Sequence, residues 1–354
     1  MAEAVPLASP LTPRRRWWQD VPPWVWPMLA LVALVICIVA IEQYRFGRTT
    51  FLKPENIRNI LNAQSYVGVV AIGMTFVIIS AGIDLSVGSM LAMLGVLGLL
   101  AANRATGGGS PEWVAVALAF AVMIGGGAAA GTINGLLVSL GRIAPFIVTL
   151  GGFAAFRSVA LTAAESGEVP YRGGQAYQWL GNTGIPIPGT NLAGRFADKP
   201  LPLTLNWSIL IFLAVAILGW VLLNRTRFGR YTVAIGANER AALYSAVPVR
   251  TIKTLVYALM GALVGLATIM ASSRMNSVSS GGTGMMLELD AIAAVVVGGT
   301  RLSGGRGTIA GTVFGVLIMG VIPNMMVMLK IDSSLQGLVK GMVIVLAVLI
   351  QKKA

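Results

Sequence analysis

Long apolar runs separated by short polar connectors dominate this sequence. A helix needs about 20 apolar residues to cross a bilayer, and this length divides the chain into about ten spans. The pattern predicts an all-α polytopic membrane protein. The expected spans are Val25–Ile41, Tyr66–Ile83, Leu85–Ala102, Trp113–Leu140, Phe146–Ala164, Trp207–Leu223, Leu255–Ala271, Ala291–Thr300, Ile309–Met328 and Leu335–Ile350.

Two places do not fit a simple crossing. Ala291–Thr300 is too short to cross alone, and around Asp84 two apolar runs meet with almost no connector. Irregular backbone is tolerated at membrane depth only where it is buried in protein or lines a polar cavity. We therefore predict broken or re-entrant helices at both places.

The spans divide into two halves of five, and an odd number makes the second half enter the membrane in the opposite direction. This is the geometry of an inverted repeat, which is common in transporters. Acid- and glycine-containing segments support the division, with Gly82–Ser89 in one half and Glu288–Ala294 in the other. We expect two inverted five-helix halves.

A basic segment of 29 residues, Arg225–Lys253, interrupts the apolar pattern with six basic residues and one acid. Such a segment cannot lie in hydrocarbon, and loops rich in Lys and Arg stay in the cytoplasm. Its middle reads as a short helix capped by Asn238 and ended by Pro248, with Glu239 at the positive end of the helix dipole. We predict a handle for a soluble partner, formed by Gly236, Asn238, Glu239, Arg240, Ala241, Ala242 and Ser245 within a cytoplasmic coupling segment, 224–253.

Charge gives the expected orientation. With the N-terminus inside, inner segments hold 14 Lys and Arg residues and outer segments hold 11. The triplet Arg14–Arg16, followed by Trp17, Trp18, Trp24 and Trp26, adds a basic and aromatic interface on the inner side. We expect both termini in the cytoplasm, as a tail over 1–24 and a tail over 351–354. Between them lies the transmembrane domain, 25–350, which includes an ordered periplasmic loop, 165–206.

Composition excludes several classes of protein. Only 11% of residues are charged, 56% are hydrophobic and the mean hydropathy is +0.80, whereas soluble domains are about 25% charged. The net charge of +13 is scattered between spans, which argues for topology and against nucleic-acid binding. The chain has no His and a single Cys, Cys37, so His-based catalysis, His metal sites and internal disulfides are excluded. We expect no cofactor.

Polar residues within apolar surroundings are the candidates for a pathway. Asp84 either lines a polar path or caps a helix by accepting bonds from the amides near Ser86 and Val87, and capping is favoured. Glu288 and Asp290 allow the same two interpretations. Arg157 is either an interface residue whose charge reaches water or a charge at a pore mouth, and Asn134 favours helix packing. The candidates for path or gating are Asp84, Ser86, Asn134, Phe146, Thr149, Glu288 and Asp290.

Several motifs together resemble one family. They are Gly73–Ser89, Ile133–Gly135 followed by Pro145–Gly151, Glu288–Ala294, Gly298–Thr300 and Gly304–Thr308. Over about 51–350 the chain resembles the permease subunits of bacterial ribose/xylose-type ABC monosaccharide importers. It departs from that pattern at Ser245-Ala246-Val247, where the family usually has Ser-Gly-Ile.

The resemblance implies a permease homodimer in the inner membrane, with an ABC ATPase docked at the coupling segment and a periplasmic sugar-binding protein on the outer side. The permease itself would do no covalent chemistry. A branched-chain amino-acid ABC permease is the alternative. A proton-coupled transporter is less favoured, because only Asp84 and Lys340 offer titratable groups in mid-membrane.

One motif needs separate treatment. Leu302-Ser303-Gly304-Gly305-Arg306 resembles the signature loop of ABC ATPases, but the sequence contains no G-x-x-x-x-G-K-[ST] to cradle a nucleotide. We expect a tight inner turn over Gly298–Gly307.

Overall fold

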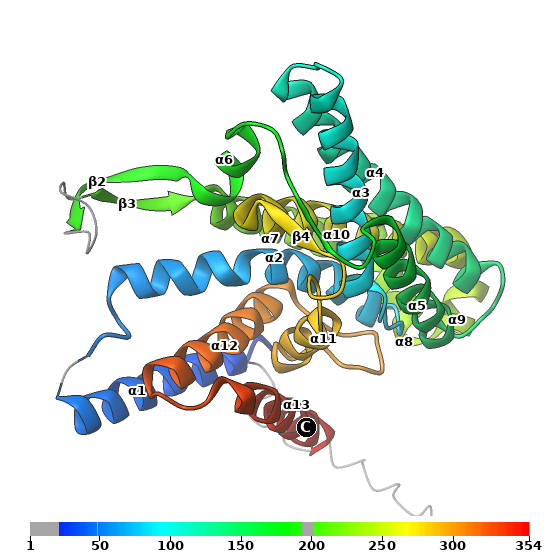
Figure 1. Ribbon diagram of the computed structural model, residues 1–354. Helices are drawn as coiled ribbons and strands as arrows, with labels where there is room; N and C mark the ends of the chain where they lie inside the picture. Colours follow the sequence, from blue (N-terminus) through cyan, green and yellow to red (C-terminus); the bar gives the residue numbers. More distant parts are fainter. Residues whose placement is uncertain (1–20, 48, 193–200, 354) are drawn as a thin grey trace, which may run out of the picture.

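The computed structural model describes residues 21–47, 49–192 and 201–353 (Figure 1). The triplet Arg14–Arg16 with Trp17 and Trp18, on which the predicted N-terminal interface depends, lies outside the described residues. The long helices are α1 (Val25–Phe46), α2 (Pro54–Ile79), α3 (Val87–Gly107), α4 (Glu112–Ser139), α5 (Pro145–Ala163), α7 (Trp207–Arg225), α10 (Val249–Met275), α12 (Ile309–Met328) and α13 (Gln336–Lys353).

Helices dominate the described chain, and eight of those described are long and apolar enough to cross a membrane. They are α1, α2, α3, α4, α5, α7, α10 and α12. The predicted all-α polytopic class is confirmed. A further helix, α11 (Leu287–Val297), has 11 residues and is too short to cross alone. The count of ten spans and the inverted halves stay predictions.

Several helices extend beyond their apolar runs. α2 begins at Pro54, well before the expected Tyr66, and α10 begins at Val249 instead of Leu255. Pro54 occupies the first helical position, where a missing amide costs nothing, and Glu55 follows in the first turn. Hydropathy detects the part of a helix that lies in hydrocarbon, so it misses these polar first turns.

The core lies around α2. In an apolar stretch of 18 residues, 78% of the α2 residues are buried, whereas only 17% are buried in the corresponding stretch of α1 at the periphery. α4 and α10 approach each other through glycine. A Cβ added to Gly127 would lie 2.2 Å from the Gly261 carbonyl oxygen, and one added to Gly131 would lie 2.1 Å from that of Tyr257. The two helix backbones come this close because glycine carries no side chain at these positions.

The segment 165–206 carries secondary structure that the sequence analysis did not predict. β1 (Glu168–Pro170) pairs antiparallel with β4 (Ser277–Ser279), α6 (Ala176–Asn182) follows, and β2 (Gly184–Leu192) pairs with β3 (Leu201–Asn206). The β2–β3 hairpin extends away from the helices (Figure 1). α6 is anchored by Tyr177, whose buried hydroxyl lies 2.5 Å from Ser272 Oγ. The part of the loop over 193–200 lies outside the described residues.

The basic segment contains two helices where we expected one. α8 (Arg227–Ala237) and α9 (Glu239–Tyr244) follow α7. The expectation that Pro248 ends the capped helix is wrong, because α9 ends at Tyr244 and Pro248 is the N-cap residue of α10. Proline suits a helix start, where its absent amide has no partner to lose.

Candidate functional site

The break between α2 and α3 forms around Asp84. Residues 80–86 connect the two helices, and Ala81 within them has a left-handed backbone (φ 61°). Asp84 is fully buried, and its Oδ1 accepts hydrogen bonds from the Ser86 amide (2.8 Å) and from Ser86 Oγ (2.6 Å). The predicted bond to the Ser86 amide is confirmed, although Ser86 and not Asp84 is the N-cap residue of α3.

Two other predicted residues join Asp84 and Ser86. Asn134 Nδ2 on α4 donates to Ser86 Oγ (3.1 Å), and Thr149 Oγ1 on α5 donates to the Ile83 carbonyl (3.3 Å). All four side chains are buried. We call Asp84, Ser86, Asn134 and Thr149 the Asp84 cluster. It binds the broken segment to two neighbouring helices, which gives the break a defined shape.

Phe146 lies one turn before Thr149 but on the surface of α5. It is 52% exposed, and the next residue, Ile147, is also exposed. α5 therefore has a buried edge that holds the break and an exposed apolar face.

Glu288 and Asp290 lie outside the Asp84 cluster. Glu288 Oε2 lies against the start of α3, because a Cβ added to Gly88 would be 2.4 Å from it. Asp290 pairs with Lys340 Nζ, at 2.8 Å to Oδ1 and 2.9 Å to Oδ2, which ties α11 to α13. Sequence reasoning treated Lys340 as a separate charge and missed this pair.

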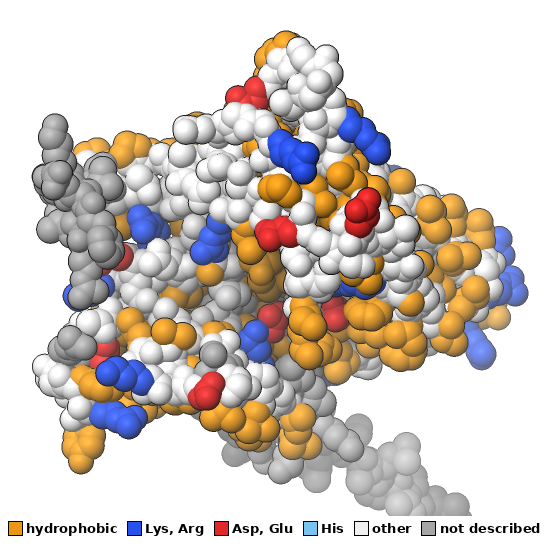
Figure 2. Space-filling view, in the orientation of Figure 1, with side chains coloured by type: hydrophobic (Ala, Val, Ile, Leu, Met, Phe, Trp, Pro, Cys, Tyr) orange, Lys and Arg blue, Asp and Glu red, His pale blue; other side chains and the backbone are white. Residues whose placement is uncertain are grey.

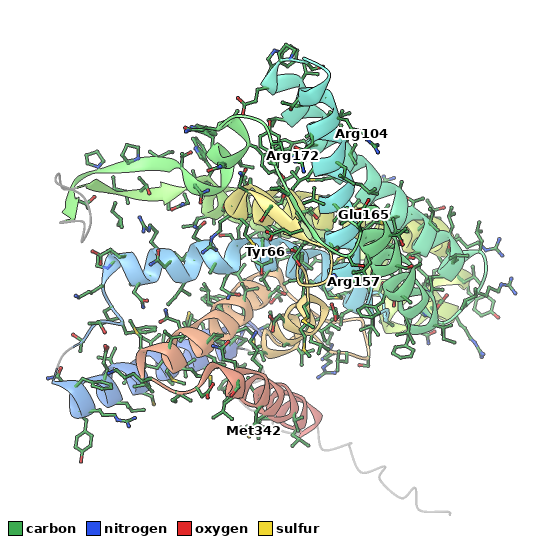
Figure 3. All side chains as sticks on the ribbon, viewed as in Figure 1. Tyr66, Arg104, Arg157, Glu165, Arg172 and Met342 are labelled. Carbon is green, nitrogen blue, oxygen red and sulfur yellow. The ribbon has the colours of Figure 1, made fainter. Side chains whose placement is uncertain are left out.

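Arg157 holds the segment that leads into α11. Its Nη1 donates to the carbonyls of Ser280 (2.7 Å) and Thr283 (3.1 Å), and the side chain points from α5 towards this segment (Figure 3). The segment ends at Met285 and Met286, which are both exposed, and Met286 has a left-handed backbone (φ 60°). Sequence reasoning noted Arg157 but did not find its role as a clamp on this loop.

α9 presents its predicted handle at the surface. The Asn238 cap is confirmed, since its Oδ1 accepts from the Ala241 amide (3.0 Å). Glu239 pairs with Lys253 (2.7 Å). Leu243 and Tyr244 are 61% and 88% exposed. Exposed positions of the handle also include Asn238, Arg240, Ala241 and Ser245, whereas Ala242 is buried.

Charged surface surrounds α9. Figure 2 shows Lys and Arg side chains gathered at the end of the molecule where α8 and α9 lie. A hollow of about 650 Å³ opens beside α9, and its walls carry Arg142, Arg250 and Lys253. This end of the molecule therefore combines a structured apolar knob with positive charge.

Gly236, the first residue of the predicted handle, lies at a junction. It is close to the C-terminal end of α8, and a Cβ added there would be 1.7 Å from the Ile79 carbonyl oxygen and 2.6 Å from the Gly305 amide. The Gly305 amide itself donates to Ile79 (2.9 Å). The end of α8 thus contacts the end of α2, five residues before Asp84.

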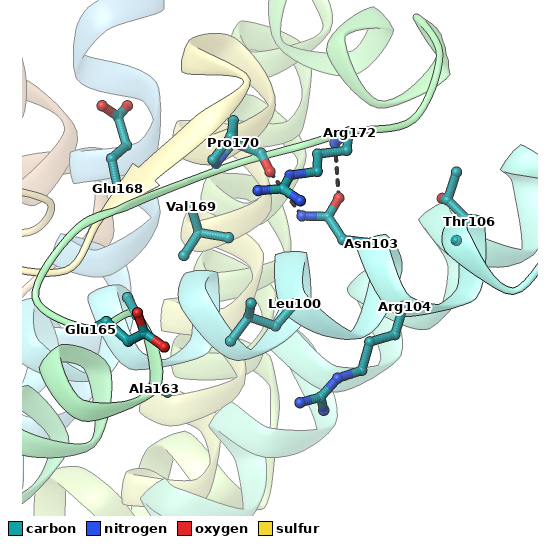
Figure 4. A pocket seen from close by; sticks show the side chains of 12 residues that line it. Leu100, Asn103, Arg104, Thr106, Ala163, Glu165, Glu168, Val169, Pro170 and Arg172 are labelled. Carbon is teal, nitrogen blue, oxygen red and sulfur yellow. Dashed lines mark hydrogen bonds between the residues drawn. The ribbon is translucent and has the colours of Figure 1, made fainter.

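A second hollow, of about 570 Å³, lies at the opposite end of α5 from α9 (Figure 4). Asn103 bridges its wall, because its Nδ2 donates to the Pro170 carbonyl (2.8 Å) and its Oδ1 accepts from the Arg172 amide (2.8 Å). Both signs of charge line it, from Arg104, Glu165, Glu168 and Arg172. In the described part of the chain, no group of three or more Asp, Glu, Cys or His could hold a metal.

Together, the helical fold and the eight described helices that are long and apolar enough to cross a bilayer define a multi-pass membrane protein. Comparison with known proteins agrees. Residues 56–348 match the family described as the permease component of the branched-chain amino acid transport system. The ribose import permease protein RbsC of Bacillus subtilis is 42% identical over 92% of each chain.

Two relatives from Escherichia coli extend this comparison. The ribose import permease protein RbsC is 39% identical over 93% of this chain and 95% of its own length, and the xylose transport system permease protein XylH is 33% identical over 90% and 91%. No solved structure matches the chain. The chain belongs to this family of ABC importer permeases. It is therefore a multi-pass inner-membrane transport subunit and not an enzyme, and its family implies a separate ATPase and a periplasmic binding protein.

Proposed function

We propose that this chain forms the translocation path for a monosaccharide of the ribose or xylose kind. The observation that carries the proposal is the similarity to ribose and xylose permeases over at least 90% of both chains. A neutral sugar needs hydrogen-bonding groups and no counter-ion. Two of the candidate acids suit this, because Asp84 accepts bonds from Ser86 through Oδ1 and Asp290 is paired with Lys340.

The branched-chain amino-acid alternative rests on the description of the wider family. A zwitterion would need exposed charges of both signs along its path. To decide between the two substrates, the chain is expressed in cells that lack their own ribose and xylose permeases but keep the partner subunits. Uptake of radiolabelled ribose or xylose that excess leucine does not compete is expected. Leucine uptake without sugar uptake would contradict the proposal.

α9 is the docking element for the ATPase in this proposal. Leu243 and Tyr244 form an apolar knob, and Arg240 supplies charge beside it. The Asn238 cap and the Glu239–Lys253 pair hold the helix in place. Because Lys253 lies on α10, movement of α9 by the partner is transmitted to α10. Of the remaining predicted docking residues, Ala241 and Ala242 lie in α9, Ser245 is its C-cap and Gly236 lies near the end of α8.

Replacing Glu239 and Arg240 with Gly tests this role. The double variant is expected to insert normally, while substrate-stimulated ATP hydrolysis and sugar uptake become uncoupled. Full stimulated hydrolysis together with full uptake in the purified complex would show that α9 is not the handle.

The path is proposed to run along the uncovered face of α5, between two copies of the chain. The Asp84 cluster is buried in one copy, so it acts in gating and not in direct contact with sugar. Phe146 on α5 and Glu288 and Asp290 at the start of α11 lie nearer to surfaces that a second copy could complete. The binding protein would dock at the end of the molecule that carries segment 165–206. The second hollow, lined by Arg104, Glu165, Glu168 and Arg172, offers charges of both signs there. We propose that both termini lie in the cytoplasm.

A further inference from the structure

The glycine motif between α11 and α12, which resembles the signature loop of an ATPase, folds into a closed turn over residues 301–306. The Arg301 amide donates to the Arg306 carbonyl (3.1 Å), and the Gly304 amide donates to the Arg301 carbonyl (3.0 Å). Gly304 and Gly305 have φ of 85° and 73°. Glycine adopts this left-handed backbone without strain, so the two glycines specify the shape of the turn.

This turn packs directly against the element that carries α9. A Cβ added to Gly304 would lie 2.9 Å from the Gly236 carbonyl oxygen, and one added to Gly305 would lie 2.8 Å from Ala237 Cα. Ala237 is the last residue of α8 and precedes Asn238, the cap of α9. The turn and the α9 handle therefore form adjoining parts of one surface.

The tip of the turn is uncovered and positively charged. Arg301, Leu302, Ser303 and Arg306 are exposed. Within the described chain, neither arginine side chain forms a hydrogen bond or an ion pair. A fixed turn that presents two guanidinium groups and one leucine is suited to a partner surface that carries carboxylates.

We propose that the 301–306 turn is a second contact for the ATPase. The turn lies beside α9 and binds acidic side chains on the surface of that partner. The proposal rests on the proposed function, because the turn can contact the ATPase only if the ATPase docks at the neighbouring α9. Retention of arginine in cytoplasmic loops would by itself explain the charge of the turn. Retention of arginine on the cytoplasmic side does not, however, require a glycine turn that packs onto α8 and bonds to the end of α2. The packing of the turn therefore favours a partner contact.

The second contact would give the partner access to both halves of the permease. The turn bonds Ile79 through the Gly305 amide, and α8 touches the same carbonyl through Gly236. Displacement of the turn and α9 together therefore reaches the Asp84 break, and it also reaches α11 and α12, which the turn connects.

The test uses the full permease co-expressed with the ATPase subunit of its transporter. The variant R301E/R306E reverses both charges, and R301Q/R306Q removes them without reversal in case the first variant does not fold. R45E/R58E makes the same change of charge near the junction of α1 and α2, at the opposite end of α2 from the turn. Monodispersity in detergent reports folding, and the amount of ATPase captured by the permease at several salt concentrations reports docking.

We expect ATPase capture to fall about tenfold for R301E/R306E and by less for R301Q/R306Q, with R45E/R58E unchanged. Reversal of acidic residues on the ATPase surface should raise capture by R301E/R306E but should not raise capture by E239G/R240G. Capture equal to wild type by both folded turn variants would overturn the proposal. So would normal capture in detergent combined with an uptake defect that follows the anionic lipid content of vesicles, since the arginines would then serve the membrane. If wild-type permease captures no ATPase, the proposed function itself fails, and this inference fails with it.

Discussion

At the scale of single residues, the site is built from polar groups that stabilise irregular backbone. A carboxylate at membrane depth costs several kcal/mol unless it is paired or hydrogen-bonded. Asp84 Oδ1 accepts two bonds from Ser86, and Asn134 donates to the same hydroxyl. Asp84 therefore belongs to the architecture of the break, and its charge is not required for the bonds that Oδ1 accepts.

Two substitutions at Asp84 separate these roles. Asn keeps the Oδ1 acceptor, so D84N should retain most sugar uptake. D84A loses the acceptor and leaves two buried Ser86 donors unsatisfied, at a cost of about 1–3 kcal/mol each, so we expect much less folded protein in the membrane. Quantitative blotting of membranes and uptake assays check both. A D84N protein that folds normally but does not transport would mean that the charge acts in gating.

The Asp290–Lys340 pair gives a second prediction at this scale. Its side chains are 27% and 26% exposed, so the pair is partly screened. D290N and K340M should each lower the melting temperature in detergent, and the double variant should lose less than the sum, with a coupling of about 0.5–3 kcal/mol. K53M, at an exposed lysine ahead of α2, is the matched control. Strict additivity would show that the pair contributes nothing.

Local contacts were predictable from sequence and distant ones were not. The bonds of Asp84 to Ser86 and of Asn238 to Ala241 join residues two and three apart, and capping chemistry indicates them directly. The pair of Asp290 with Lys340 and the clamp of Arg157 on Ser280 join residues 50 and 123 apart. Those contacts depend on how helices pack, which no local pattern specifies.

At the scale of elements, the contact of α8 with the end of α2 links the handle to the break. Gly236 permits this contact because a side chain would overlap the Ile79 carbonyl. Sequence analysis included Gly236 in the predicted handle, but its packing partner came only from the structure. The strands were missed for the same reason, since β1 and β4 have three residues each and pair across the chain.

Substitution of Gly236 tests this link. G236A should force α8 away from Ile79 and destabilise the protein by about 1–3 kcal/mol, as overpacking does, and uptake per molecule of bound ATPase should fall. G125A is the matched control, because a Cβ added to Gly125 meets nothing within 4 Å. Wild-type uptake and stability in G236A would show that the contact has no mechanical role.

At the scale of the whole molecule, hydropathy indicated the class and each of the long helices in the described part of the chain. It also indicated that α11 is short and that the chain breaks at Asp84. It did not predict α8, which is amphipathic and short, or the β2–β3 hairpin. Topology remains a prediction that one fusion can check.

A reporter fused after Ala354 tests the predicted topology. With both termini inside, an enzyme that is active only in the cytoplasm should be active in this fusion, and a reporter that is active only in the periplasm should be silent. The reverse pattern would mean that one span was counted wrongly, with α11 the first place to look because it has only 11 residues.

The central claim is that this chain is the membrane path of an ATP-driven monosaccharide importer. The most direct measurement is uptake of radiolabelled ribose and xylose into proteoliposomes that contain this permease, its ATPase and its binding protein. The account predicts accumulation that requires all three proteins and requires ATP on the side of the membrane where the ATPase lies. This accumulation should persist when the proton gradient is collapsed. Uptake by the permease alone that disappears with the proton gradient, or transport of leucine in place of either sugar, would contradict it.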